Sequence, residues 1–284
     1  MRLLCILSLL LVCLAGVSVS AATCPTNSGI PFKLYRGYVV VVRGSIGAVE
    51  KLNFIVDTAA VPSVVDERVV RKLNLRGSET SVSTFTREAK TMLVRAPDMR
   101  VGPIHAGQID VLARDLSGIS QTLGMRVDAM IGFDLLGRAA FTIDYRCKRL
   151  IFGQVDSSWA SVPYKAGLAY PLIELAVQGG RVSVVVDTGA SGLVLFDKTA
   201  EPYLSGARRR GAETWSNLGG DVQVRKIEIP QLALGASAWS DRKAFVLEHA
   251  EGPSGVHGLL GPMALGLERI AFDPERATFS WSGQ

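Results

Sequence analysis

Apolar residues fall into short β-branched runs along most of the chain, and glycine, proline and asparagine separate these runs. Such runs are typical of strands in an all-β sandwich or barrel. Two segments have helical spacing instead. The first begins with a capping-box pattern at Ser63 and Asp66 and continues to Leu73; the second is weaker and covers residues 196–204. The pattern predicts a mostly β protein with one short helix in each half.

The same order of segments occurs twice along the chain. Three pairs of segments match: residues 53–60 with 183–190, 129–132 with 258–261, and 141–144 with 270–273. The spacing is also kept, since Gly132 follows Asp57 by 75 residues (132 − 57) and Gly261 follows Asp187 by 74 (261 − 187). Two copies of one domain are therefore expected in a single chain.

The first 22 residues form a separate segment. An arginine precedes an almost wholly apolar run from Leu3 to Val19, and three small residues follow, ending at Ala22. We predict a signal peptide over residues 1–22 and export to the periplasm or the extracellular space. An uncleaved membrane anchor is the alternative, since about 20 apolar residues can span a bilayer. The remainder is expected to divide into an N-terminal domain, residues 23–158, and a C-terminal domain, residues 159–284.

Composition and charge exclude several classes of protein. A hydrophobic content of 48% excludes a disordered chain. The net charge of +5 is scattered, with residues 208–210 as the only run of three basic residues, so we expect no nucleic-acid partner. The three histidines lie far apart and no Cys/His cluster exists, so no metal or cofactor is expected. Cys24 and Cys147 remain after the signal segment and form either one disulfide or two free thiols.

Two aspartates occupy matched positions, each at the end of an apolar run. A carboxylate beside a core strand is costly unless hydrogen bonds stabilise it, and Thr58, Thr188 and Gly189 offer such bonds. If the two copies pack around a two-fold axis, Asp57 and Asp187 face each other and share one proton. One carboxylate can then activate a water while the other protonates a carbonyl, without a metal or a covalent intermediate. Separate structural roles, in which each aspartate caps a turn, are the alternative.

These motifs resemble those of a known enzyme family. Residues 185–191 read Val-Val-Asp-Thr-Gly-Ala-Ser, and Ile131-Gly132 and Leu260-Gly261 supply an apolar-glycine pair in each half. The chain resembles the aspartic proteases from about Ile30 onward, more closely the retropepsin-like branch than pepsin. The resemblance implies two retropepsin-like β-barrel domains related by a pseudo-two-fold axis. It also implies an active site in the cleft between them, with Asp57 and Asp187 as the catalytic pair and the apolar-glycine pairs packed behind their loops.

The resemblance also implies roles for neighbouring residues. Support for the active-site loops is expected from Thr58, Ala59, Ala60, Thr188, Gly189 and Ala190. Each half should have a hairpin that could act as a flap. The candidates are residues 81–92, with Phe85 at the tip, and residues 213–224, with Trp215, Gly219 and Gly220. Ordinary exposed hairpins are the alternative. Ala59 stands where the family usually has glycine, and its methyl group is either tolerated or displaces Asp57.

The expected function is that of an exported aspartic endopeptidase. Its substrate would be a peptide or protein with apolar residues beside the cut bond, and the enzyme would be a monomer with an intramolecular pseudo-dimer. Pepsin-like enzymes carry Ser or Thr where this chain has Ala60 and Ala190, and loss of that hydroxyl predicts a mildly acidic optimum. The alternatives are a non-catalytic peptide-binding protein of the same fold, and a dimer in which each half pairs with its like in another chain.

Overall fold

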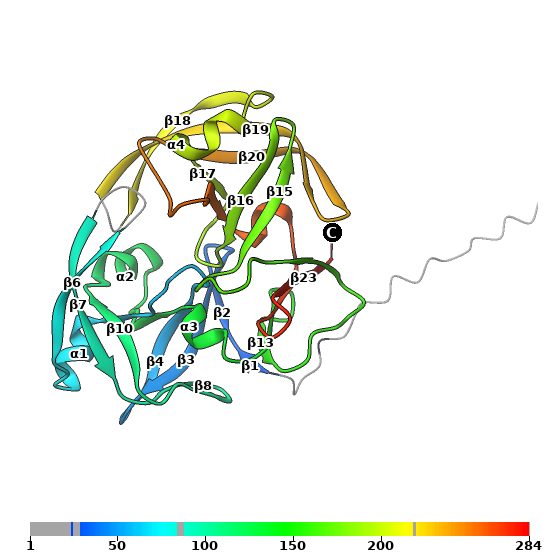
Figure 1. Ribbon diagram of the computed structural model, residues 1–284. Coiled ribbons are helices and arrows are strands. Elements are labelled where there is room, and N and C mark those ends of the chain that lie inside the picture. Colours follow the sequence, from blue (N-terminus) through cyan, green and yellow to red (C-terminus); the bar gives the residue numbers. More distant parts are fainter. Residues whose placement is uncertain (1–23, 25–28, 84–87, 218–219, 284) are drawn as a thin grey trace, which may run out of the picture.

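Strands dominate the structure. The computed structural model describes residue 24 and residues 29–83, 88–217 and 220–283. In this part of the chain the strands form three sheets (Figure 1), which confirms the predicted all-β class. The signal segment and Phe85 and Gly219 lie outside the described residues.

The first half of the chain builds a ten-stranded sheet. Its strands are β2 (Lys33–Tyr35), β3 (Val39–Ile46), β4 (Val49–Val56), β5 (Val64–Asp66), β6 (Gly77–Ser83), β7 (Glu88–Ala96), β8 (Met99–Val101), β9 (Ile104–His105), β10 (Ile109–Arg114) and β11 (Ala129–Ile131). The order is β6-β7-β10-β5-β11-β4-β3-β8-β9, and β2 adds to β3. β4 and β11 pair in parallel, with Val56 opposite Ile131. The loop after β4 therefore lies beside the glycine that follows β11.

The second half repeats this arrangement in a seven-stranded sheet. Its strands are β15 (Leu172–Val177), β16 (Gly180–Val186), β17 (Leu193–Phe196), β18 (Arg208–Asn217), β19 (Gly220–Leu234), β20 (Ser237–Leu247) and β21 (Gly258–Leu260). The order is β15-β16-β21-β17-β20-β19-β18. β16 and β21 pair in parallel, with Val186 opposite Leu260, as β4 and β11 do in the first half. The two sheets therefore present their aspartate loops in equivalent positions.

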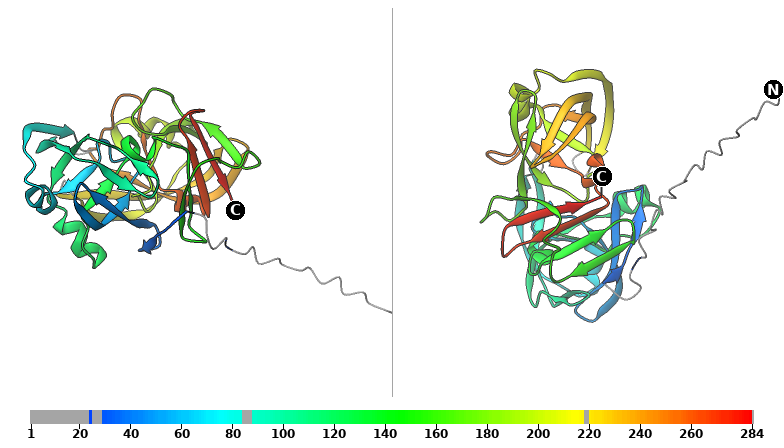
Figure 2. Two further views of the ribbon diagram at one scale, coloured as in Figure 1. Left: turned by 90° about the horizontal axis from the view of Figure 1, so that it is seen from below. Right: turned by 90° about the vertical axis from the view of Figure 1, so that its right-hand side faces the viewer.

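A six-stranded sheet joins the halves. It contains β1 (Ile30–Pro31), β12 (Phe141–Asp144), β13 (Arg149–Phe152), β14 (Ala160–Pro163), β22 (Arg269–Asp273) and β23 (Thr278–Ser282). The order β1-β13-β12-β22-β23-β14 takes three strands from each half. At its centre Ile143 lies opposite Ile270 and the ring of Phe141 stacks on Phe272 at 4.8 Å. The antiparallel β12–β22 pair thus marks the pseudo-two-fold axis, and Figure 2 shows this sheet between the two lobes.

Alternation along the strands divides the apolar side chains among three clusters. In β4, Phe54 and Val56 enter a main core that extends through both halves and the six-stranded sheet, whereas Ile55 points to the opposite face. The first satellite cluster contains Val39, Val41, Ile55, Val64, Leu112, Leu116 and Val127. The second satellite cluster contains Leu172, Val185, Val194, Phe196, Val224, Leu247, Ala250, Val256 and Leu259. Each half therefore has an apolar surface separate from the main core.

The predicted helices are found in altered form. α1 spans Glu67–Lys72 and its N-cap is Asp66, which accepts a hydrogen bond from the Arg68 backbone N–H, so the prediction that the helix begins at Ser63 is wrong. Residues 64–66 instead form β5, because this segment pairs in parallel with β10. In the second half α4 (Asp197–Ala200) and a 3-10 turn (Glu201–Tyr203) lie within the predicted segment.

The expectation of one helix per half is also wrong. The first half contains two further helices, α2 (Ser117–Leu123) and α3 (Phe133–Leu136). A 3-10 turn at Pro262–Leu265 stands at the place of α3 in the second half. The additional helix α2 has no counterpart between β20 and β21 among the described residues.

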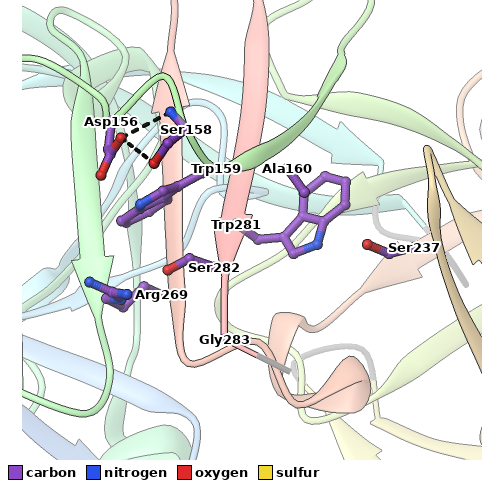
Figure 3. A pocket seen from close by; sticks show the side chains of 9 residues that line it. All are labelled: Asp156, Ser158, Trp159, Ala160, Ser237, Arg269, Trp281, Ser282 and Gly283. Carbon is purple, nitrogen blue, oxygen red and sulfur yellow. Dashed lines mark hydrogen bonds between the residues drawn. The ribbon is translucent and has the colours of Figure 1, made fainter. Parts of the chain in front are cut away.

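Two contacts stabilise the N-terminal segment and the connection between the halves. A disulfide joins Cys24 to Cys147, so the structure contains the bridged alternative for these cysteines. At the connection between the halves, the Arg269 guanidinium lies over the Trp159 ring, 5.1 Å from its centroid. These two side chains and Trp281 line a hollow of about 460 Å³ on the six-stranded sheet (Figure 3). Neither aspartate of the predicted pair lines this hollow.

Candidate active site

The two aspartates sit in equivalent loops. Asp57 follows β4 and its backbone N–H donates to the carbonyl of Ile131 at 3.0 Å; Asp187 follows β16 and its N–H donates to Leu260 at 2.9 Å. The aspartates are only 8% and 7% exposed. The parallel strands thus hold both carboxylates in buried positions where the halves meet.

Two threonines bind the loops to each other across the pseudo-two-fold axis. The backbone N–H of Thr58 donates to the Thr188 hydroxyl at 3.1 Å, and the N–H of Thr188 donates to the Thr58 hydroxyl at 3.2 Å. Each hydroxyl then donates to the opposite strand: Thr58 to the Val186 carbonyl at 2.6 Å and Thr188 to the Val56 carbonyl at 2.8 Å. These four reciprocal bonds fix the relative position of the two aspartates.

Backbone N–H groups stabilise each carboxylate from its own loop. The Asp57 Oδ1 accepts from Ala59 at 3.0 Å and from Ala60 at 3.1 Å. The Asp187 Oδ1 accepts from Gly189 at 2.7 Å. The two carboxyl groups also act on each other directly, since the pKa of each one depends on its partner.

Burial raises the pKa of both carboxyl groups. For Asp57, desolvation is the largest cause of the upward shift, and the N–H of Ala59 and the hydrogen bond with Asp187 oppose it. For Asp187, desolvation and the nearby negative charge of Asp57 hold the pKa well above the usual range of a carboxyl group. The two carboxyl groups therefore titrate as a coupled pair, in which the first proton is lost more easily than the second.

The apolar-glycine pairs pack directly behind these loops. A Cβ atom at Gly132 would lie 1.5 Å from the Ala60 carbonyl oxygen, and one at Gly261 would lie 2.2 Å from the Ala190 carbonyl oxygen. No side chain fits at either distance, so glycine is required at both positions for the backbones to approach. Ile131 and Leu260 precede these glycines and are fully buried.

Ala59 and Gly189 occupy matched positions in the two loops. A Cβ atom at Gly189 would lie 2.8 Å from the Asp57 Oδ2, closer than side chains tolerate. The Ala59 methyl group instead packs against the second satellite cluster. Ala59 has no left-handed backbone conformation and its N–H still bonds to Asp57, so the methyl group is accommodated without loss of that contact.

Hairpins occur at both predicted flap positions. β6 and β7 pair in the first half, and β18 and β19 pair in the second, with Trp215 opposite Val222. The Trp215 ring packs against the Phe245 ring at a tilt of 54°, with centroids 4.7 Å apart, and its indole N–H donates to Glu213 at 2.7 Å. Both hairpins project toward the same side of the molecule in Figure 1. Gly220 is the first residue of β19, whereas Phe85 and Gly219 lie outside the described residues.

An apolar cavity opens beside the aspartate pair. It has a volume of about 320 Å³ and includes Asp57 and Gly189 in its lining. Most of its wall comes from the first half: Tyr38, Val39, Ile55, Gly118, Ile119, Thr122, Leu123 and Met130. Helix α2 supplies four of these residues, and the sequence interpretation missed it. The spacing of Leu116, Ile119 and Leu123, followed by Gly124, is the signal that could have identified this helix.

The described part of the chain offers neither a metal-binding cluster nor a membrane-spanning helix. No group of three or more His, Cys, Asp or Glu residues there could hold a metal ion. Within the same residues, no helix combines the length and apolar character needed to cross a membrane. The nitrogen Nδ1 of His257 accepts a hydrogen bond from the Ser183 backbone at 2.8 Å, which is a structural role.

Comparison with known proteins agrees with this geometry. The aspartyl protease family model matches residues 42–135 and again residues 173–264, one match in each half. No curated protein gives a significant match. The two matched segments cover more than half of the chain, and each contains one of the two aspartates with its threonine and its apolar-glycine pair. The chain therefore belongs to the aspartyl protease family, with one family domain in each half.

Proposed function

We propose that this protein is an aspartic endopeptidase that hydrolyses peptide bonds with a water held between Asp57 and Asp187. One observation carries the proposal: two buried carboxyl groups with coupled pKa values lie on loops that reciprocal threonine bonds from both halves hold together. Neither a capped turn nor a core strand requires such a pair. Two coupled carboxyl groups with one proton supply an acid and a base in the same place.

In the proposed chemistry the pair shares one proton, which Asp187 carries before the reaction. Asp57 takes a proton from the water as its oxygen attacks the peptide carbonyl carbon, and Asp187 gives its proton to the carbonyl oxygen. The product is a neutral tetrahedral diol. Asp57 then passes its proton to the leaving nitrogen while Asp187 recovers a proton from a diol hydroxyl, and the C–N bond breaks. The two carboxyl groups finish in their starting protonation states, so turnover needs no other reagent.

The surroundings of the pair favour an extended peptide as substrate. The cavity beside Asp57 is lined mainly by apolar side chains, which suits an apolar residue next to the cut bond. Trp215 and Phe245 provide an apolar surface in the other half. Because both halves of one chain supply the site, the active species is proposed to be a monomer.

Export is part of the proposal. The disulfide between Cys24 and Cys147 suits an oxidising compartment, such as the periplasm or the extracellular space. An N-terminal signal segment would direct the chain there, and an uncleaved anchor would place it at the membrane surface. N-terminal sequencing of the protein from its native host, in membrane and soluble fractions, separates these two forms.

Cleavage of a degenerate peptide library tests the function directly. Residues 23–284 are incubated with the library over a pH series beside the Asp187→Asn variant. The proposal predicts cleavage by the native protein and loss of at least about 1,000-fold for the variant. If the folded native protein cuts nothing at any pH but binds peptides equally well with or without Asp187→Asn, the fold serves as a peptide-binding module instead.

A further inference from the structure

The hollow at the connection between the halves has the size of a small-ligand site. Its volume is about 460 Å³, and neither aspartate of the pair lines it. Small-ligand sites typically enclose about 300–1,000 Å³. Figure 3 shows that the connection between the halves supplies Asp156, Ser158 and Trp159, while β22 and β23 supply Arg269 and Ser282. A small ligand here would therefore contact both the connection and the second half.

Arg269 brings a positive charge to this hollow. Its guanidinium lies over the Trp159 ring, 5.1 Å from the centroid, and forms no ion pair within the described part of the chain. Asp144 lies opposite Arg269 on β12, but its carboxylate accepts from the Cys147 backbone N–H at 2.7 Å. An aromatic ring that covers one face of a guanidinium fixes its plane and leaves its N–H edge free. Such an edge can bind a carboxylate through two parallel hydrogen bonds.

Asp156, the acidic residue of the hollow, is bonded to its own loop. Its Oδ1 accepts from the Ser158 backbone N–H at 2.9 Å and from the Ser158 hydroxyl at 2.7 Å, as the dashed lines in Figure 3 show. The bond from the Ser158 hydroxyl lowers the pKa of Asp156, so this carboxyl group is ionised at neutral pH. A fixed negative charge nearby disfavours a ligand with two negative charges relative to a ligand with one.

Ser282 offers a hydrogen-bond donor beside Arg269. The two residues lie directly opposite each other on the paired strands β22 and β23. The Ser282 hydroxyl oxygen is buried and has no hydrogen-bond partner among residues 24, 29–83, 88–217 and 220–283. A buried hydroxyl without a partner is costly, and rotation about the Cα–Cβ bond lets it donate to an acceptor that enters the hollow. One anionic group could thus bind both side chains.

We propose that this hollow binds an organic monocarboxylate, with its carboxylate on Arg269 and Ser282 and a planar apolar body against Trp159. Trp281 also lines the hollow and extends the aromatic surface. A small free carboxylate and the C-terminal residue of a peptide share this chemistry. The inference goes beyond the proposed endopeptidase function and does not depend on it.

Titration of residues 23–284 with benzoate, benzamide and inorganic phosphate tests the proposal. The indole N–H signals of the four tryptophans are followed by NMR, and Trp159→Phe assigns the signal of Trp159. Benzoate should shift this signal to saturation with a millimolar or tighter Kd. Benzamide has the same shape without the charge and should bind at least about 10-fold more weakly. No saturable shift with benzoate, equal binding of benzamide, or tighter binding of phosphate overturns the inference.

Arg269→Gln removes the charge and should raise the Kd for benzoate at least about 10-fold. Arg269→Lys keeps the charge but loses the paired N–H edge, so its Kd should lie between those of the native protein and Arg269→Gln. Arg209→Gln is the matched control, because Arg209 is exposed on β18, outside the hollow, and its loss changes the net charge equally. An equal rise in Kd for Arg209→Gln and Arg269→Gln would mean general attraction of anions and overturns the site.

N-acetylphenylalanine and its amide identify the source of the carboxylate. Tighter binding of N-acetylphenylalanine than of benzoate, lost in the amide, supports the site and identifies a peptide C-terminus as its ligand. Tighter binding of benzoate supports the site and identifies a small free carboxylate. None of these measurements uses peptide cleavage, so their failure leaves the proposed function in place.

Discussion

The two halves of the site share their backbone and hydroxyl contacts but differ in what surrounds them. In both halves the aspartate N–H donates to the carbonyl of the apolar residue in the apolar-glycine pair, Ile131 or Leu260. The two threonines also make the same pair of hydrogen bonds from each side. The first loop, however, is also fixed by Ser63, whose hydroxyl bonds to Asp134 at 2.6 Å and accepts from the Gly132 N–H at 2.9 Å. Leu193 stands at the matched position in the second half and cannot make these bonds.

The outer strands differ in a similar way. In the second half β19 is a continuous strand of 15 residues that pairs with both β18 and β15. In the first half the equivalent path is divided between β7 and β8. Helix α2 follows β10 only in the first half. The contacts that position the carboxylates are therefore symmetric, whereas the elements that surround them are not.

Exchange of the residues at positions 59 and 189 should have the largest effect. Gly189→Ala places a methyl group 2.8 Å from the Asp57 Oδ2, so Asp57 must move. We expect kcat/KM to fall at least about 100-fold, the loss that a displacement of about 1 Å can produce. Ala59→Gly, the reciprocal change, should retain turnover. Full activity in Gly189→Ala would show that the pair tolerates the displacement.

Removing the threonine hydroxyls tests whether the halves contribute equally. Thr58→Val deprives the Thr188 N–H and the Val186 carbonyl of their partner, and Thr188→Val does the same to the Thr58 N–H and the Val56 carbonyl. Each unsatisfied buried group costs roughly 1–3 kcal/mol, so either variant should lose at least about 2 kcal/mol of unfolding free energy. Urea denaturation measures this. A large loss in only one variant would contradict the symmetric arrangement.

Ser63→Ala probes a contact that only the first half possesses. The substitution leaves the Gly132 N–H without its acceptor and removes one bond from Asp134. We expect a loss of about 1–2 kcal/mol in unfolding free energy. Ser191→Ala, at an exposed position in the second loop, is the control and should stay within about 0.5 kcal/mol of the native protein. Equal effects of the two variants would show that Ser63 does not stabilise its loop.

The smallest predicted effect concerns pH and stability. Burial and the charge of Asp57 raise the pKa of Asp187 in the folded protein, so its protonated form is favoured there. This contribution to stability is fully present below the unfolded pKa and is lost as pH rises through the folded pKa. Asp187→Asn cannot ionise and should raise Tm at pH 7 by at least about 2 °C, the shift that roughly 1 kcal/mol produces in a chain of 150–250 residues.

Thermal unfolding at two pH values tests whether folding raises or lowers the pKa of Asp187. The gain in Tm for Asp187→Asn should shrink toward pH 4, where the native carboxyl group is already protonated. A larger gain at pH 4 than at pH 7 would mean that the pKa of Asp187 is lowered on folding.

The repeat made the fold and the site predictable from sequence. Asp-Thr at the end of an apolar run and an apolar-glycine pair about 75 residues later occur in both halves, and the close approach behind Gly132 and Gly261 explains why glycine recurs. At residues 64–66 the apolar spacing predicted a helix, but these residues form β5 because they pair with the neighbouring strand β10. Helix α2 escaped prediction because Leu116, Ile119 and Leu123 give only two turns of spacing.

The sequence could not predict where the Ala59 methyl group lies or that a cavity opens beside Asp57. The sequence leaves open whether the Ala59 methyl group is tolerated or displaces Asp57. In the structure the methyl group packs onto the second satellite cluster, and the Ala59 N–H keeps its bond to Asp57. The cavity beside Asp57 depends on α2 and on Gly189 from the opposite half. Such a volume arises only when both halves are assembled.

The central claim, one dyad built from both halves, is tested most directly by a double-mutant cycle on kcat/KM with Asp57→Asn, Asp187→Asn and the double variant. Groups that act as a unit are strongly non-additive. We expect each single variant to lose at least about 1,000-fold and the double variant to lose no more than either. Substantial activity in one single variant, or losses that add in the double variant, would show that the aspartates do not form one catalytic unit.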